Sequence, residues 1–216
     1  MERIGAAMFD DRTDAGNRLA AELERRGLEV DVVLGIPRGA LPVARPVADA
    51  LDAELDVVVA RKLGAPGNPE LAVGAVASDG SVWHNDALVD RLGVSEDYLE
   101  EIEREEAENA RQKADRYRDG SEMPDLEGKR VAVVDDGVAT GATAIACLRQ
   151  VHEAGADHVV LAVPVGSPQS VEELGSEADE VIALRTPADF RAVGQFYRTF
   201  GQVSDADAIE YLEQDR

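Results

Sequence analysis

This sequence has a single cysteine, no histidines at the spacing of metal ligands and no long apolar run. Cys147 is the only cysteine of the 216 residues, so neither an internal disulfide nor a cysteine metal cluster can form. His84, His152 and His158 lack the spacing of metal ligands. No apolar run approaches the roughly 20 residues that span a bilayer, and Met1–Asp10 lacks the basic and apolar segments of a secretion signal. We therefore expect a soluble, cytoplasmic protein with no membrane partner.

Basic residues are half as frequent as acidic ones. The chain has 22 Lys and Arg against 44 Asp and Glu, a formal net charge of −22. Such a surface repels nucleic acid, whose phosphates need clustered basic side chains. Only Lys62, Lys113 and Lys129 are lysine. Acid excess with few lysines indicates a halophilic protein in molar salt, where the Debye length is about 3 Å; an ordinary acidic protein is the alternative.

Short apolar strands alternate with helical stretches along the whole chain, and this pattern predicts one α/β domain over residues 1–216 with a mostly parallel sheet covered on both faces. The strands are expected at Val30–Leu34, Asp56–Arg61, Arg130–Asp135, Asp157–Val163 and Glu180–Leu184. The helices are expected at Thr13–Arg26, about 40–53, Ser95–Arg118, Ala142–Glu153, Pro168–Leu174 and Ser204–Leu212.

Two stretches between these elements have their own patterns. Leu63–Pro69 is rich in Gly and Pro, which predicts a loop. Val73–Ala77 and Val82–Trp83 flank a turn and predict a hairpin. The long helix Ser95–Arg118 is acidic in its first half and basic in its second, an order that suits the helix dipole.

One segment combines a buried strand, two carboxylates and a loop of small residues. The strand Val131–Val134 is followed by Asp135 and Asp136, and a helix begins shortly afterwards. Ligands of open parallel sheets bind at such carboxyl ends of strands. Free N–H groups at the helix start and two hydroxyls predict a phosphate site over Ala139, Thr140, Gly141, Ala142 and Thr143. No Lys follows Gly141, so this is not a Walker A loop.

Asp135 and Asp136 would repel a phosphate ligand unless they face another group. Ribose hydroxyls, a hydrated Mg²⁺ or both would satisfy the two carboxylates. The alternative is a polar turn that ends the strand.

Residues 131–143 resemble the phosphoribosyl diphosphate (PRPP) signature of type I phosphoribosyltransferases, with Gly137 departing slightly from it. Gly35–Ala40, Arg61–Leu71, Phe190 and Val193–Tyr197 resemble a poorly characterised PRPP-binding subfamily. The resemblance covers nearly the whole chain. It implies a three-layer α/β/α phosphoribosyltransferase-like fold with a core at about 28–184, a mobile lid and a small hood.

Two segments of this acidic chain contain basic residues and no acidic ones. Leu34–Val43 carries only Arg38, and Val57–Pro69 carries only Arg61 and Lys62. A positive local charge at two strand ends suits a diphosphate. In the family that the sequence resembles, the loop after the first strand binds pyrophosphate, often through a non-proline cis peptide. This implies a pyrophosphate site at Pro37, Arg38, Gly39, Arg61 and Lys62, with Pro37-Arg38 as the candidate cis peptide.

The family resemblance also implies a lid and a hood. The lid is expected at about 62–72 and possibly 86–120, where Arg111, Lys113 and Arg116 provide basic charge; Glu70 is a candidate base or cap. The hood is expected at about 185–203 together with the N-terminal segment. Its aromatic residues are expected either to stack on an acceptor ring or to form the hood core: Phe190, Phe196 and Tyr197.

The resemblance implies transfer of a 5-phosphoribosyl group from Mg-PRPP to a nitrogen acceptor such as a nucleobase, with release of pyrophosphate. Asp135, Asp136, Arg38 and Lys62 are the expected catalytic residues, and the two Asp are expected to contact Mg²⁺ indirectly, through water or ribose. A homodimer is expected. Two alternatives stay open: a non-catalytic PRPP or nucleotide sensor that acts on a protein partner, and an unrelated nucleotide-binding doubly wound domain.

Overall fold

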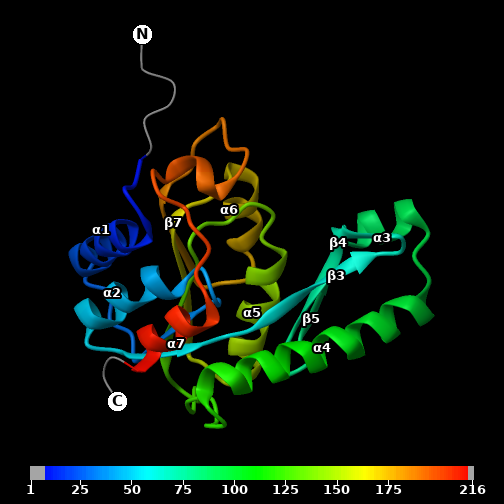
Figure 1. The fold of residues 1–216 in the computed structure, drawn as a ribbon, viewed down its shortest axis with the longest axis horizontal. Coiled ribbons are helices and arrows are strands. Elements are labelled where there is room, and N and C mark those ends of the chain that lie inside the picture. The colour runs from blue at the N-terminus through cyan, green and yellow to red at the C-terminus, as the bar shows by residue number, and fades with distance from the viewer. Residues whose placement is uncertain (1–7, 214–216) are drawn as a thin grey trace.

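The computed structural model describes residues 8–213, and its centre is a five-stranded parallel sheet (Figure 1). The strand order is β2-β1-β6-β7-β8, and every neighbouring pair is parallel. The strands are β1 (Val32–Gly35), β2 (Glu54–Val57), β6 (Arg130–Val134), β7 (His158–Val165) and β8 (Glu180–Arg185).

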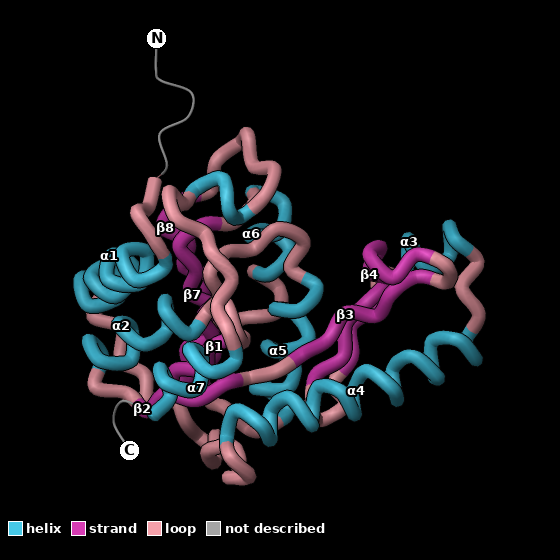
Figure 2. Tube along the Cα trace, viewed as in Figure 1, coloured by secondary structure: helices cyan, strands magenta, loops and turns pink. Residues whose placement is uncertain are grey.

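Helices cover both faces of this sheet (Figure 2). On one side lie α1 (Arg12–Arg25), α2 (Leu41–Leu51) and α7 (Asp205–Glu213); on the other lie α5 (Ala142–Glu153) and α6 (Pro168–Leu174). Alternate strand residues face opposite layers: Val33 and Val160 pack with α1 and α2, whereas Leu34 and Val133 pack with α5. Burial on both faces explains why these strands are continuous apolar runs, and the predicted three-layer α/β/α architecture is confirmed.

A second, antiparallel sheet projects from this core (Figure 1). It consists of β3 (Ala60–Ala65), β4 (Asn68–Ala77) and β5 (Val82–His84), and with α3 (Asp86–Leu92) it forms what we call the hairpin arm, residues 60–92. The long helix α4 (Glu96–Arg118) then returns along the arm to the main core. The Tyr98 hydroxyl donates to the Gly64 carbonyl at 2.9 Å and so ties α4 to β3.

Two predictions in this region are wrong. Asp56–Arg61 is not one strand, because β2 ends at Val57 and β3 begins at Ala60 in the other sheet. Leu63–Pro69 is not a loop either, since most of it lies in β3 and β4. Its glycines and prolines serve an irregular hairpin: the pairing register shifts at Gly64, where a Cβ atom would lie only 2.7 Å from the Pro69 Cα atom.

The other elements agree with the predicted ones to within a few residues, and the hairpin formed by β4 and β5 is confirmed. Ser95 caps α4, as its hydroxyl accepts from the Tyr98 N–H at 3.3 Å. The short helix α3 was not predicted; it begins after Asn85, whose side chain caps it. Within residues 8–213, no helix is both long and apolar enough to cross a membrane.

The segment 186–204 contacts residues 8–12. A short 3-10 helix, η1 (Val193–Phe196), is followed by Tyr197, which forms an isolated parallel β-bridge with Phe9. The Phe196 carbonyl accepts from the Phe9 N–H at 2.9 Å. The two segments that were expected to form a hood therefore pack together; Met1–Ala7 lies outside the described residues.

Candidate functional site

The β6–α5 loop, residues 135–141, connects the central strand to the start of α5. The Val138 N–H donates to the Val165 carbonyl at 2.9 Å, and the Ala139 carbonyl accepts from the hydroxyls of Ser167 at 3.1 Å and Ser170 at 2.6 Å. Gly141 has φ +77° and no side chain caps the helix. The first N–H groups of α5 thus have no capping side chain, an arrangement that suits an anion; the phosphate site itself stays a prediction.

Asp136, in this loop, contacts residues from both segments that were expected to form the hood. Its Oδ2 atom accepts from the Arg12 Nε at 2.8 Å. Arg12 also donates to the Gly201 carbonyl at 2.7 Å, and its guanidinium lies 3.8 Å from the centroid of the Phe200 ring. Asp135 accepts from the Asp136 N–H at 2.8 Å. One carboxylate therefore has a cationic partner, whereas the other has a backbone donor only.

Burial raises the pKa of Asp135 well above its ordinary value, and the charge of Asp136 raises it further. Burial also raises the pKa of Asp136, although Arg12 opposes this shift. Two adjacent carboxylates with one arginine leave negative charge that a hydroxyl donor or a cation would stabilise. Among the described residues, no three His, Cys, Asp or Glu side chains are grouped so as to hold a metal ion by themselves.

The loop after β1 lies directly against Asp136. A Cβ atom on Gly39 would be 2.5 Å from the Asp136 Oδ2 atom, so this close approach requires glycine. The Pro37-Arg38 peptide bond is cis, which confirms the prediction made for it. The Lys113 Nζ donates to the Pro37 carbonyl at 3.0 Å, and Arg38 points to Asp205 at 3.5 Å. The loops that follow β1 and β6 are therefore neighbours.

Arg61 and Lys62 lie next to each other on β3 but point in different directions. The Arg61 Nε contacts Glu106 on α4 at 2.8 Å. Lys62 lines three separate cavities, and its charge lowers the pKa of Asp135. One cavity, of about 140 Å³, lies at the β6–α5 loop and is also lined by Thr140. Lys62 is thus the basic residue of the arm that faces the candidate phosphate site.

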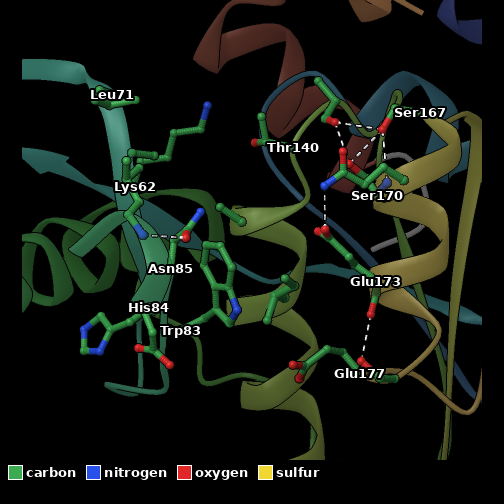
Figure 3. A pocket seen from close by; sticks show the side chains of 18 of the residues that line it. Lys62, Leu71, Trp83, His84, Asn85, Thr140, Ser167, Ser170, Glu173 and Glu177 are labelled. Atoms are coloured by element: carbon green, nitrogen blue, oxygen red, sulfur yellow. Dashed lines mark hydrogen bonds between the residues drawn. The ribbon is translucent and has the colours of Figure 1, made fainter. Parts of the chain in front are cut away.

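A cavity of about 670 Å³ lies between the hairpin arm and α6. Figure 3 shows Lys62 and Trp83 on the arm side, Ser170 and Glu173 on the opposite side, and Thr140 between them. The β6–α5 loop therefore opens into this space. Glu70, the candidate base or cap, is exposed and lines the same cavity.

The aromatic residues that were expected to form a hood contact each other. The Phe190 and Phe196 ring centroids are 5.3 Å apart, and those of Phe9 and Tyr197 are 5.4 Å apart. Phe196 and Tyr197 are buried, and the Tyr197 hydroxyl donates to the Asp136 carbonyl at 2.5 Å. The structure packs these rings against one another; a hood formed by them and contact with an acceptor both stay predictions.

Sequence reasoning missed two partners of the site. Arg12 was not expected, because nothing near it in the sequence marks it, and it meets Asp136 across 124 residues. Asp205 was not expected either, and it contacts Arg38 together with Arg116. Lys113 was considered only as part of a lid, together with Arg111, which pairs with Glu108 on the surface instead.

The family model described as "Phosphoribosyl transferase domain" matches residues 7–197. The chain belongs to the phosphoribosyl transferase family. The family match and the fold together confirm the predicted type I membership.

Two relatives share nearly half of the residues of this phosphoribosyl transferase chain. A Mycobacterium tuberculosis protein with a provisional phosphoribosyl transferase name is 45% identical over 207 residues, which are 96% of this chain and 47% of that protein. The chain therefore spans about half the length of this curated relative. A solved structure from Thermus thermophilus is 46% identical with a TM-score of 0.80, and the match covers 94% of this chain and 97% of that one.

A more distant structure shares the phosphoribosyl transferase fold. A protein from Neisseria gonorrhoeae, solved with bound ppGpp, has a TM-score of 0.51 at 17% identity, and the match covers 100% of this chain and 99% of that one. At this identity the likeness extends to the fold alone.

Proposed function

We propose that this protein transfers the 5-phosphoribosyl group of PRPP to a nitrogen nucleophile and releases diphosphate. The proposal depends on the contact between two loops. The β6–α5 loop begins with Asp135 and Asp136, and Gly39 of the loop after β1, which we call the β1 loop (residues 36–40), lies against Asp136. Family membership supports the same reaction class.

Each part of PRPP has a proposed partner. The 5-phosphate binds the N–H groups and hydroxyls of residues 139–143 at the start of α5. The ribose hydroxyls donate to the carboxylates of Asp135 and Asp136. The diphosphate binds the backbone of Pro37, Arg38 and Gly39 and the side chains of Arg38, Arg61 and Lys62.

The reaction exchanges one bond at the anomeric carbon. The C1–O bond breaks, and its electron pair leaves on the diphosphate oxygen. A nitrogen lone pair forms the new C1–N bond from the opposite side, and the nitrogen then loses its proton to solvent. Positive charge builds on the ribose and negative charge on the leaving group, so fixed cations beside the diphosphate lower the barrier.

Mg²⁺ fits this site as part of the substrate complex. The carboxylates of Asp135 and Asp136 share one arginine, Arg12, so their remaining charge suits a cation held through water or ribose. Mg²⁺ keeps several waters and binds substrate phosphates rather than needing an all-protein cage. When bound, it would neutralise charge on the diphosphate.

The remaining assignments are parts of the same proposal. Residues 1–216 form one transferase unit, in which residues 62–72 act as the lid, with 86–120 as the less secure candidate, and residues 185–203 act as the hood over the acceptor. The acceptor is a nucleobase or a related amine, and the active form is a homodimer. The packing of Phe9 against Tyr197 supports a hood built from both ends of the domain.

Binding and turnover test the proposal separately. Isothermal titration with Mg-PRPP measures binding, and a panel of purines, pyrimidines and amines, followed through released diphosphate, measures transfer. We expect Asp135→Asn and Asp136→Asn to lower turnover by about 100-fold or more. Asp157 is exposed and lies directly before β7, so Asp157→Asn is the control variant and should leave turnover unchanged.

Undiminished turnover in the Asp135 and Asp136 variants would refute the site. PRPP binding without diphosphate release from any member of the panel would overturn transfer and favour a ligand sensor that acts on a protein partner.

A further inference from the structure

Lys113 places a half-buried amino group next to the β1 loop without an acidic partner. Its Nζ donates to the Pro37 carbonyl at 3.0 Å. In the part of the chain that the structure describes, Lys113 forms no ion pair. An ammonium group has three donors, so Lys113 keeps donors for another acceptor.

The cavity beside Lys113 is rich in basic side chains. It has a volume of about 380 Å³, lies between β3 and α4, and is lined by Arg61, Lys62, Lys113 and Thr143. Its one carboxylate, Glu106, is already paired with Arg61 at 2.8 Å. Two of the three lysines of the whole chain line this cavity, although acidic residues are twice as frequent as basic ones. Such a local reversal of charge favours a small, highly charged anion.

The charges around Lys113 make its ammonium form costly while no anion is present. Burial lowers the pKa of Lys113, Arg61 and Arg38 lower it further, and Asp205 and Cys147 oppose the shift. A cation that is partly desolvated among other cations is stabilised when an anion enters.

We propose that Lys113 is a further diphosphate-binding residue, which adds a cation from α4 to Arg61 and Lys62 of the proposed diphosphate site. The inference rests on the proposed function and adds α4 to its site. Lys62 and Thr143 line both this cavity and the one at the β6–α5 loop, so the two spaces adjoin. Lys113 joins this site to the β1 loop through Pro37.

Inorganic diphosphate is the probe for this site. Its affinity is measured by isothermal titration in the presence of Mg²⁺ and at one KCl concentration for all proteins. We expect Lys113→Met to weaken binding by about tenfold or more, the effect of one lost charge-assisted hydrogen bond. Arg111→Met removes the same charge from the same helix, but Arg111 is exposed and pairs only with Glu108. This control should bind within about twofold of the parent protein.

Lys113→Arg keeps both the positive charge and a donor for the Pro37 carbonyl, so the alkaline-pH comparison below separates charge from bracing of the loop. Because the charge is kept, binding should recover to within a few fold. At alkaline pH, the parent protein should lose affinity before Lys113→Arg does, because the lowered pKa releases the Lys113 proton earlier while arginine stays charged. Thermal unfolding of each variant checks that the fold is intact.

Equal affinities for Lys113→Met and Arg111→Met would overturn the inference, as would a folded Lys113→Arg that fails to restore binding. These results are distinct from failure of the proposed function. If the parent protein binds Mg-PRPP, and Lys113→Met binds diphosphate and Mg-PRPP as tightly as the parent protein does, only the proposed role of Lys113 is refuted. If the parent protein binds no Mg-PRPP, the proposed function falls by itself.

Discussion

At the scale of single residues, Asp135 and Asp136 illustrate how a side chain that serves a binding site can lower the stability of the protein. Arg12 pairs with Asp136, but Asp135 is partly buried beside a like charge and receives one backbone hydrogen bond. The pKa of Asp135 is therefore raised, and its ionised form destabilises the ligand-free protein at neutral pH. Such conflicts between stability and local charge are typical of functional sites.

Replacing Asp135 by Asn should stabilise the ligand-free protein. Because the pKa is raised in the native state, the free energy of unfolding falls as pH rises from the ordinary value of 3.8 through the raised value. Asn removes this cost, so the melting temperature at neutral pH should rise by about 2–4 °C, the shift that ~1 kcal/mol gives in a chain of this size. Thermal unfolding at several pH values measures the effect.

The gain should disappear below the ordinary Asp pKa, where Asp135 is protonated in both states. Asp136→Asn is the matched control: it weakens the ion pair with Arg12 and should show a smaller gain or none. A neutral-pH melting temperature for Asp135→Asn equal to that of the parent protein would contradict the account.

At the scale of elements, α4 connects parts of the molecule that are far apart in sequence. Its first half carries Tyr98 and Glu106, which bind the hairpin arm. Its second half carries Lys113, which holds the β1 loop, and Tyr117, whose hydroxyl donates to Asp205 on α7 at 2.7 Å. This polar helix, whose basic half was expected to be a possible part of a lid, is therefore a structural link between the arm and the candidate site.

The end of α4 is fixed by a buried ion pair, and breaking it should be costly. The Arg118 Nε lies 3.0 Å from Asp56, and both side chains are buried. Arg118→Met leaves Asp56 charged and unpaired, so the free energy of unfolding should fall by about 3–5 kcal/mol in urea titrations. Arg116→Met removes an exposed pair with Asp205 and should cost no more than about 1 kcal/mol.

Adding Asp56→Asn to Arg118→Met should recover part of the lost stability, because the unpaired charge is then absent. Similar unfolding midpoints for Arg118→Met and Arg116→Met would show that the buried pair does not anchor α4.

At the scale of the whole molecule, the net charge of −22 and the proposed affinity for an anionic ligand are compatible because charge is distributed unevenly. Acidic side chains cover exposed surfaces, among them the first half of α4. The cavity between β3 and α4 carries the opposite sign. The surface repels like charge, and salt screens that repulsion.

Added KCl should stabilise this protein. Raising KCl from dilute buffer to molar concentration should increase the thermal unfolding midpoint steadily, since the Debye length falls to about 3 Å and repulsion among carboxylates is screened. The same titration at acidic pH, where carboxylates are protonated, should show a weaker increase. A midpoint that does not change with KCl at neutral pH would contradict the halophilic interpretation.

The sequence by itself determined what depends on neighbouring residues. Apolar runs predicted the buried parallel strands, and the change from Val131–Val134 to two carboxylates and a small-residue loop predicted the β6–α5 site. The isolated pair of cations at Arg61 and Lys62 marked the strand that faces the site. These signals are local, because strand burial, helix capping and backbone conformation are encoded within a few residues.

The tertiary structure decided which distant side chains meet. It paired Arg12 with Asp136 across 124 residues and brought Lys113 to Pro37 across 76. It also converted the segment Leu63–Pro69 into a hairpin, since pairing between β3 and β4 overrides the local preference of glycine and proline for a loop. No local pattern records such contacts, because they arise only when separate helices and strands pack around one core.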